Sequence, residues 1–434
     1  MLDRALSSSD ADEAAARRAV MLATTISVDP GTFLAVAAVA ALAGTIAAVM
    51  TERVIVVPVV VVELLLGVLI GPKVLGLHVN EFIDFFSALG LGLLFFFAGY
   101  EIDVHRIAGQ PLRLALLGWA LSLALAYAIG GALVAAGVVL SLLYTGSAMS
   151  TTALGTLLPV LSDAGELRTK FGSYLLAAGA VGELGPILLL TLILSAQSTV
   201  HNALILFAFV VLAVGVAIFA VRSSQRTLPI FERTLERSSQ LAVRWIVVLV
   251  FALAMLAFEL GLDLLLGGFA AGVITRQVLK AREIPEFDSK MTAIAFGVFV
   301  PFFFIVSGMK LDVSALFASA GSVAKIFLFF ALFLVVRGVP ALLLYRKALS
   351  GRERRALALM SSTQLPLVLA ITTLAVEAGH MRASTAAALV GAAVLSTLVF
   401  PILGLRLRDD LDDGHMDGVE AEAGAEAGSP APAA

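Results

Sequence analysis

One carboxylate within a long apolar run is the residue of this sequence best suited to chemistry. Glu183 is the only charged residue between Phe171 and Ala196, a run long enough to cross a membrane. A carboxylate at the centre of a bilayer costs about 3 kcal/mol on insertion scales, so such a residue is a functional candidate by default. Glycines and a proline surround it, and they loosen the helix and let a neighbouring backbone approach closely. These residue types favour a buried group that binds a proton or a cation.

Two other apolar windows, at about 138–161 and 356–377, carry polar residues at their centres. Non-helical backbone at membrane depth is tolerated only against protein or a water-filled cavity. Either interruption alone is explained by small-residue packing between helices. Two interruptions at corresponding positions of two halves instead favour a binding site at the midplane, where hydroxyl and carbonyl oxygens surround a cation. The candidate residues are Ser150, Thr151, Thr152, Ser362, Thr363 and Gln364.

Two more charged residues lie inside apolar segments. Measured along its helix, Arg337 is roughly 14 Å from the end that faces the Lys- and Arg-rich side of the membrane. Glu183 is roughly 18 Å from the corresponding end of its own helix, so the two residues lie at similar depth. An arginine keeps its proton, so Arg337 is a fixed positive charge that can balance the site. The alternative is a structural ion pair between two helices. Glu63 is either a second titrating site or a buried hydrogen-bonding group.

The elements that position these residues follow from hydropathy. Of the 434 residues 60% are hydrophobic and only 14% charged, and the mean hydropathy is +1.01. This composition predicts an all-α polytopic membrane protein. Thirteen transmembrane helices are expected, at about 31–50, 54–71, 83–101, 111–136, 138–161, 171–196, 200–221, 243–260, 262–279, 292–309, 321–346, 356–377 and 383–405.

The charges of the loops predict how the chain is oriented in the membrane. Most of the 29 Lys and Arg residues fall on one side, which predicts an outside N-terminus and a cytoplasmic C-terminus.

The sequence also contains an internal repeat. Gly99–Val104 matches Gly308–Val313, each after a triple phenylalanine, and Met149–Thr152 matches Met360–Thr363. The matching segments are an odd number of helices apart. The sequence therefore predicts inverted repeats of the kind found in secondary transporters.

Several classes of function are disfavoured. The chain has no cysteine, which excludes disulfide and thiolate chemistry, and its five histidines are scattered without metal-site spacing. No basic run suggests a nucleic-acid partner, and no Gly-x-Gly-x-x-Gly follows a strand. No His/Asp/Glu cluster or Gly-x-Ser-x-Gly motif suggests an enzyme. No cofactor is expected. The acidic, then Ala-, Gly- and Pro-rich segment 409–434 is predicted to be disordered and solvated.

Several motifs resemble those of a known family. They are Gly67–Pro72 after Val57-Pro58, Phe97–Asp103, and Phe303–Asp312. Over about 30–408 the chain resembles the monovalent cation:proton antiporter superfamily, in particular its KefB-like branch and the NapA-type sodium/proton antiporters. The resemblance implies an NhaA/NapA-like fold, in which two unwound helices, here 138–161 and 356–377, cross in a core domain. It also implies that Glu183 is the core carboxylate.

The same resemblance divides the chain. A polar segment, 1–30, precedes the transmembrane domain 31–408. Core helices are expected at about 111–196 and 321–405, dimerisation or scaffold helices at about 31–101 and 243–309, and a linker helix at about 200–221. A homodimer embedded in the lipid of the cytoplasmic membrane is expected. A nucleotide-sensing domain, found on some Kef-type relatives, is not expected.

The resemblance implies exchange of Na+ or K+ for H+ by competition at Glu183. Relatives usually carry Asp at this position, preceded by Asp, Asn or Gln, whereas here Gly182 precedes Glu183. Arg337 lies where relatives carry Lys or Arg. One carboxylate and an arginine that stays charged predict one-for-one, electroneutral exchange. The alternatives are a channel-like potassium efflux path of the Kef type and an organic-anion symporter on the same fold.

Overall fold

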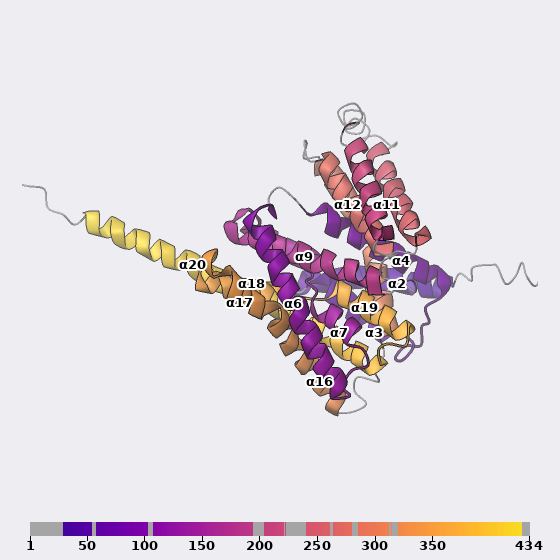
Figure 1. Ribbon diagram of the computed structural model, residues 1–434. Coiled ribbons are helices and arrows are strands. Elements are labelled where there is room, and N and C mark those ends of the chain that lie inside the picture. Colours follow the sequence, from indigo (N-terminus) through magenta and orange to yellow (C-terminus); the bar gives the residue numbers. More distant parts are fainter. Residues whose placement is uncertain are drawn as a thin grey trace, which may run out of the picture.

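The structure of the protein, a computed structural model, is helical throughout the part of the chain it describes (Figure 1). Eight helices of this part are long and apolar enough to cross a membrane, and four shorter apolar helices accompany them. One of the shorter helices, Leu204–Ala220, covers the expected linker helix. The described residues are 29–53, 58–102, 107–193, 204–220, 222, 240–260, 264–279, 285–311, 314 and 320–427.

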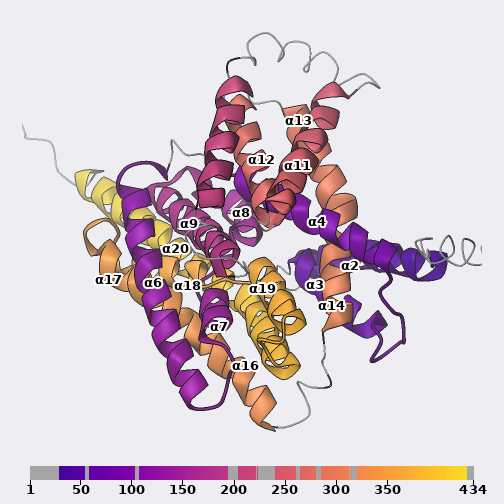
Figure 2. The ribbon, with the colours of Figure 1, turned by 45° about the vertical axis from the view of Figure 1, so that its right-hand side comes forward.

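A first group of helices packs together, and this group contains the N-terminal helices and those after residue 240. Its members are α2 (Pro30–Arg53), α3 (Val59–Ile70), α4 (Glu81–Tyr100), α11 (Leu241–Glu259), α12 (Leu264–Leu279), α13 (Pro285–Ile294) and α14 (Val300–Lys310). The largest contacts are α4 with α12 and α3 with α14. Figure 2 shows α11, α12 and α13 together above α4, with α2, α3 and α14 beside it.

A second group surrounds the polar interruptions. Its members are α6 (Gln110–Ala135), α7 (Leu142–Met149), α8 (Leu154–Asp163), α9 (Lys170–Ile193), α16 (Ala320–Phe333), α17 (Val339–Leu344), α18 (Gly351–Ser361), α19 (Pro366–Glu377) and α20 (Ala383–Ala427). The principal helix contacts between the groups are α4 with α8 and α12 with α9. The groups therefore meet over a small part of their surfaces.

Glycines bring the two main helix pairs of the first group into backbone contact. A Cβ at Gly272 of α12 would overlap the carbonyl oxygen of Phe96 of α4, and one at Gly308 of α14 would overlap that of Leu64 of α3. Gly99 and Gly67 make the reciprocal contacts with α12 and α14. Gly99 and Gly308 begin the matched repeat segments, and Gly67-Val-Leu likewise corresponds to Gly272-Val-Ile. Each half therefore supplies one helix to each pair, as a two-fold relation between the halves requires.

Local sequence explains where several helices begin and end. Asp29 caps α2, and the hydrogen bonds from Thr32 and Gly31 lower the pKa of its carboxyl. The Asn80 side chain accepts from the Ile83 amide at the start of α4. Ser350 and Glu353 form a capping box at the start of α18. At the end of α6, Gly137 takes a φ of 69° that glycine tolerates without strain.

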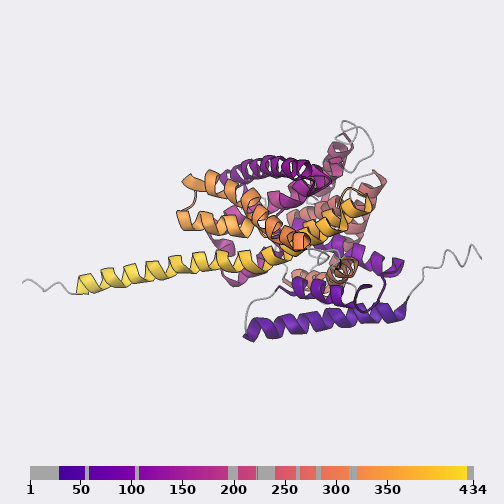
Figure 3. The same cartoon turned by 90° about the horizontal axis from the view of Figure 1, so that it is seen from below.

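The C-terminal segment differs from the sequence prediction. Disorder is predicted from residue 409, whereas α20 continues as a helix to Ala427 and extends away from the other helices (Figure 3). The alanines and glutamates before Ala427 are strong helix formers, so they extend a helix that the membrane segment has already nucleated.

The contact between α4 and α12 gives a testable prediction. Gly272→Ala places a methyl group against the α4 backbone, and overpacking of this kind costs typically about 1–3 kcal/mol. We expect its midpoint of thermal unfolding in detergent to fall below that of the unmodified protein. The matched control is Gly131→Ala on α6, where a Cβ meets nothing within 4 Å. Equal midpoints for the two variants would contradict the close approach.

Candidate functional site

Two interrupted helices cross at the centre of the second group. Between α7 and α8, residues 150–153 leave the helical conformation, and between α18 and α19 residues 362–365 do the same. The interruptions bond to each other: the Ala153 amide donates to the Thr363 carbonyl at 2.8 Å. The Thr152 hydroxyl donates to the Ser361 carbonyl at 2.6 Å. Backbone groups freed from one helix are thus satisfied by the other, as a membrane interior requires.

Gln364 joins the crossing from the opposite side. Its Nε2 donates to the Met149 carbonyl at 3.0 Å, and its Oε1 accepts from the Thr151 hydroxyl at 3.1 Å. Its own backbone bonds to hydroxyls of α20, since its amide donates to Ser396 Oγ and its carbonyl accepts from Thr397. The side chain therefore holds the end of α7 and the interruption after α18 in one register.

The six predicted polar residues divide by what they bond. Thr151, Thr152 and Gln364 make the contacts across the crossing described above. Ser150 and Ser362 instead donate back to carbonyls of their own helices, at 3.0 and 2.6 Å. Thr363 supplies a backbone carbonyl to the crossing, while its buried Oγ1 has no hydrogen-bond partner within the described ranges.

Glu183 lies on α9 against the first interruption. The residue is 3% exposed. The backbone amide of Leu154, the first residue of α8, lies close to its carboxylate. The N-terminus of a helix carries partial positive charge, which favours a carboxylate there. Its Oε2 is buried and has no hydrogen-bond partner among the described residues. One oxygen of the carboxylate is therefore available to a ligand.

That oxygen belongs to a residue lining a cavity between the two helix groups. The cavity has a volume of about 250 Å³, enough for several water molecules. Its described lining is apolar except for Glu183, Glu101 and Thr156, and it includes Pro366 at the second interruption. The two glutamates are the ionisable residues of this lining. A cavity of this kind attracts cations and disfavours anions.

Sequence reasoning missed Glu101 as a site residue. It follows the last residue of α4 and sits in the repeated motif Gly99–Val104, which indicates a repeat and a family resemblance but gives Glu101 no role of its own. A signal was present, because a carboxylate at the end of an apolar helix next to a broken neighbour can face a shared cavity. Nothing in the sequence, however, places α4 against α8 and α9.

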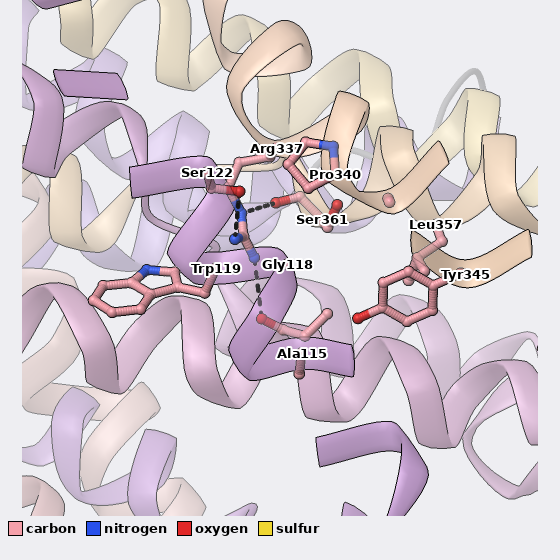
Figure 4. Close-up of a pocket in the computed structure, with 11 residues that line it drawn as sticks. Ala115, Gly118, Trp119, Ser122, Arg337, Pro340, Tyr345, Leu357 and Ser361 are labelled. Carbon is pink, nitrogen blue, oxygen red and sulfur yellow. Dashed lines mark hydrogen bonds between the residues drawn. The ribbon is translucent and has the colours of Figure 1, made fainter. Parts of the chain in front are cut away.

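Arg337 lies on the other side of the crossing. It sits in a π-helical turn, Leu334–Gly338, between α16 and α17, a local irregularity that is frequent at functional sites. Its guanidinium donates to Thr152 Oγ1 at 2.9 Å, Ser122 Oγ at 3.3 Å and the Ala178 carbonyl at 3.1 Å. Figure 4 shows Ser122 and Ser361 facing this group.

Arg337 and Glu183 are not paired. Within the part of the chain that the structure describes, no ion pair joins them. Their nearest connection runs through Gly182, where an added Cβ would lie 2.7 Å from both Arg337 Nη2 and Thr152 Oγ1. The glycine thus leaves the space that the guanidinium fills. Of the two sequence hypotheses, direct pairing is absent. The guanidinium instead binds oxygens from α6, α9, α18 and the first interruption.

Glu63 is separate from this arrangement. It is 3% exposed within α3, and its Oε2 also lacks a hydrogen-bond partner among the described residues. It is not among the residues that line the cavity of Glu183. Its role as a second titrating site stays a prediction.

The bonds of Arg337 give a second test. Thr152→Val keeps the side-chain shape but removes the nearer acceptor of the Arg337 Nε–H, which then has only the Ser361 carbonyl at 3.4 Å. Weakening the bonding of a buried charged group in this way costs about 1–3 kcal/mol. We expect a lower midpoint of thermal unfolding than for the control Thr372→Val. That control removes a buried hydroxyl that bonds only carbonyls of its own helix. Identical midpoints would show that Thr152 is not holding the arginine.

Comparison with known proteins identifies the family. Residues 36–405 match the family described as sodium/hydrogen exchanger, transmembrane. The putative Na+/H+ antiporter YjbQ of Bacillus subtilis is 25% identical over 366 residues, covering 80% of this chain and 58% of the relative. A Na+/H+ antiporter of Enterococcus hirae is 29% identical over 267 residues, covering 59% and 68%. The chain thus aligns with less than two thirds of the length of YjbQ.

A solved structure supports the same assignment at the level of fold. The sodium proton antiporter MjNhaP1 from Methanocaldococcus jannaschii superposes with a TM-score of 0.62 at 15% identity, covering 86% of this chain and 95% of that one. The crossing of two interrupted helices beside a buried carboxylate is therefore set in a fold that this antiporter shares. With the family match extending over most of the chain, the protein belongs to the sodium/hydrogen exchanger family.

Proposed function

We propose that the protein exchanges a monovalent cation, Na+ or K+, for H+ by competition of the two at Glu183. The observation that carries the proposal is the buried, unpartnered Oε2 of Glu183 in a cavity beside the crossing. A deprotonated carboxylate binds an alkali cation, and a protonated one does not. Because one oxygen pair cannot hold both, movement of the occupied site exchanges them across the membrane.

The surroundings of Glu183 support a cation as the transported ion. Carboxylate, hydroxyl and carbonyl oxygens are the ligands that hard cations prefer. The relatives' names point the same way, since they include Na+/H+ antiporters and a Na+/H+-K+ antiporter, GerN of Bacillus cereus. The acidic lining of the cavity disfavours an organic anion, the substrate of one alternative. A channel-like potassium path, the other alternative, would carry current without proton counterflow.

The moving part is proposed to be the second helix group. It contains Glu183, the crossing and Arg337, and it meets the first group mainly where α8 contacts α4 and α9 contacts α12. The first group, with its backbone contacts between helices, serves as the scaffold. Sliding or rocking of the second group against it opens the site to one side and then to the other, as in an elevator.

The finer topology belongs to the same proposal. The eight long apolar helices, the four shorter ones and the interrupted pair α7–α8 fit thirteen crossings. With the N-terminus outside and the C-terminus in the cytoplasm, the cavity of Glu183 lies on the cytoplasmic side. The protein is proposed to work as a homodimer in the cytoplasmic membrane, with the first helix group at the subunit contact.

Replacement of the central carboxylate tests the exchange. Glu183→Gln keeps the shape of the side chain but removes the charge that binds a cation. We therefore expect the exchange rate to fall to that of vesicles that lack the protein. The measurement is recovery of a pH gradient in everted vesicles on addition of NaCl, KCl or choline chloride. The control is Glu259→Gln, whose side chain is exposed at the end of α11. Exchange by Glu183→Gln at the unmodified rate would rule out this site.

Stoichiometry has its own test. Arg337 keeps its charge and Glu183 carries one ion or one proton, so we expect one-for-one, electroneutral exchange. In proteoliposomes with a fixed Na+ gradient, the initial rate should be the same with and without an imposed membrane potential. One elementary charge moved across 100 mV is worth about 2.3 kcal/mol, so electrogenic exchange would change the rate strongly. A rate that changes with the imposed membrane potential would contradict one-for-one, electroneutral exchange.

A further inference from the structure

We propose that Glu101 is a second cation contact of the same cavity, fixed on the scaffold and serving the cytoplasmic side only. The inference rests on the proposed function. It concerns a residue that the exchange at Glu183 does not itself require. It starts from two carboxylates that line one cavity from two different helix groups.

The geometry places both acids at one cavity. Glu183 comes from α9, and Glu101 directly follows α4. Each has a buried Oε2 without a hydrogen-bond partner among the described residues. Glu183 is 3% exposed, whereas Glu101 is partly exposed. The two are close enough to interact coulombically. Two like charges at one apolar cavity are unfavourable unless a proton or a cation lies between them.

In the part of the chain that the structure describes, no ion pair neutralises Glu101. Arg276 of α12 is close enough to interact coulombically with Glu101, but it forms no ion pair with it in the described part of the chain. Its guanidinium instead lies over the ring of Tyr100, 5.6 Å from the centroid. The hydroxyl of Tyr100 donates to Asp288. Among the described residues, Glu101 therefore lines the cavity without an ion pair to this cluster.

Among the residues that the structure describes, the opposite side of the membrane lacks this contact. In the repeat, Glu101 corresponds to Lys310, which forms an ion pair with Asp84 at 2.7 Å. Asp84 and Lys310 line a second cavity of about 330 Å³, whose described lining does not include Glu183. The acid that assists Glu183 is thus present on one side, and on the other side a lysine already paired takes its place.

These observations give Glu101 a defined role. A cation entering from the cytoplasm meets Glu101 at the cavity and is shared with, or handed to, Glu183. When the second helix group moves, Glu183 carries its ion away and Glu101 stays with α4. Because the charge of Glu101 does not cross the membrane, the contact raises cytoplasmic affinity without altering the one-for-one exchange.

The test compares the two faces of the membrane. Loss of one charge-assisted contact is expected to weaken binding by roughly one order of magnitude. We expect Glu101→Gln to raise the apparent KM for Na+ about tenfold in everted vesicles, where the cytoplasmic face is outside, and to leave it unchanged in right-side-out vesicles. The maximal rate should persist. Glu101→Asp should restore most of the affinity, and Glu81→Gln, exposed on the same helix, should match the unmodified protein.

Other results overturn the inference in distinguishable ways. An unchanged KM at both faces removes Glu101 from the site but leaves Glu183 in place. An equal rise at both faces, or complete loss of exchange, makes Glu101 part of the moving site instead of a one-sided contact. Absence of exchange in the unmodified protein defeats the proposed function and this inference together.

A second measurement tests the inference if the Glu101→Gln variant folds poorly. The chain has no cysteine, so Glu101→Cys introduces a single thiol. We expect a membrane-impermeant cationic thiosulfonate to modify it in everted but not in right-side-out vesicles. Added NaCl, compared with choline chloride, should slow the modification. Modification from the outside, or no effect of NaCl, would refute a cytoplasmic cation contact.

Discussion

The protein depends on satisfying polar groups where water is absent. Two helices are interrupted in the middle of apolar segments, which exposes amides and carbonyls that hydrocarbon cannot satisfy. The interruptions bond to each other through Ala153, Thr363 and Thr152, and Gln364 closes the crossing from its other side. Arg337 then binds the oxygens that remain. A buried guanidinium with several charge-assisted hydrogen bonds is tolerated, whereas an unpaired one would be strongly destabilising.

This arrangement separates the fixed charge from the exchangeable one. Arg337 is held by neutral oxygens and does not contact Glu183, so nothing in its bonding needs to change when Glu183 binds or releases a proton. Glu183 itself lies close to one backbone amide at the start of α8, and its Oε2 has no hydrogen-bond partner among the described residues. In the proposed mechanism the positive charge stabilises the crossing, while the carboxylate on its other side binds the cation or the proton. Gly182 makes this possible, because any side chain there would compete with the guanidinium for space.

The two helix groups are built differently, which suits the scaffold and moving roles proposed for them. In the first group, glycines bring α4 against α12 and α3 against α14 at backbone distance. Close contacts of this type are stiff, since neither helix can shift without a clash. In the second group, the interrupted helices, the π-helical turn at Arg337 and Pro186 within α9 give a less regular structure. The cavity that both groups line is therefore bounded by a rigid wall and by a body that carries the binding residue.

The sequence alone determined the helical class, the central carboxylate and the two interruptions. Each is visible in a short stretch of sequence because it is energetically unfavourable there: a charge lies in an apolar run, or a proline and polar residues lie where a helix should continue. It also predicted the matching glycines, because a repeat is visible in one dimension. Only the tertiary structure decided what these residues contact. The similar depth of Arg337 and Glu183 in the membrane allowed a contact between them. Depth does not fix the direction in which a side chain leaves its helix, and Arg337 faces Thr152 and Ser122 instead. Glu101 became a site residue only when α4 was placed beside α8 and α9, since contacts between distant segments depend on packing that no local pattern encodes.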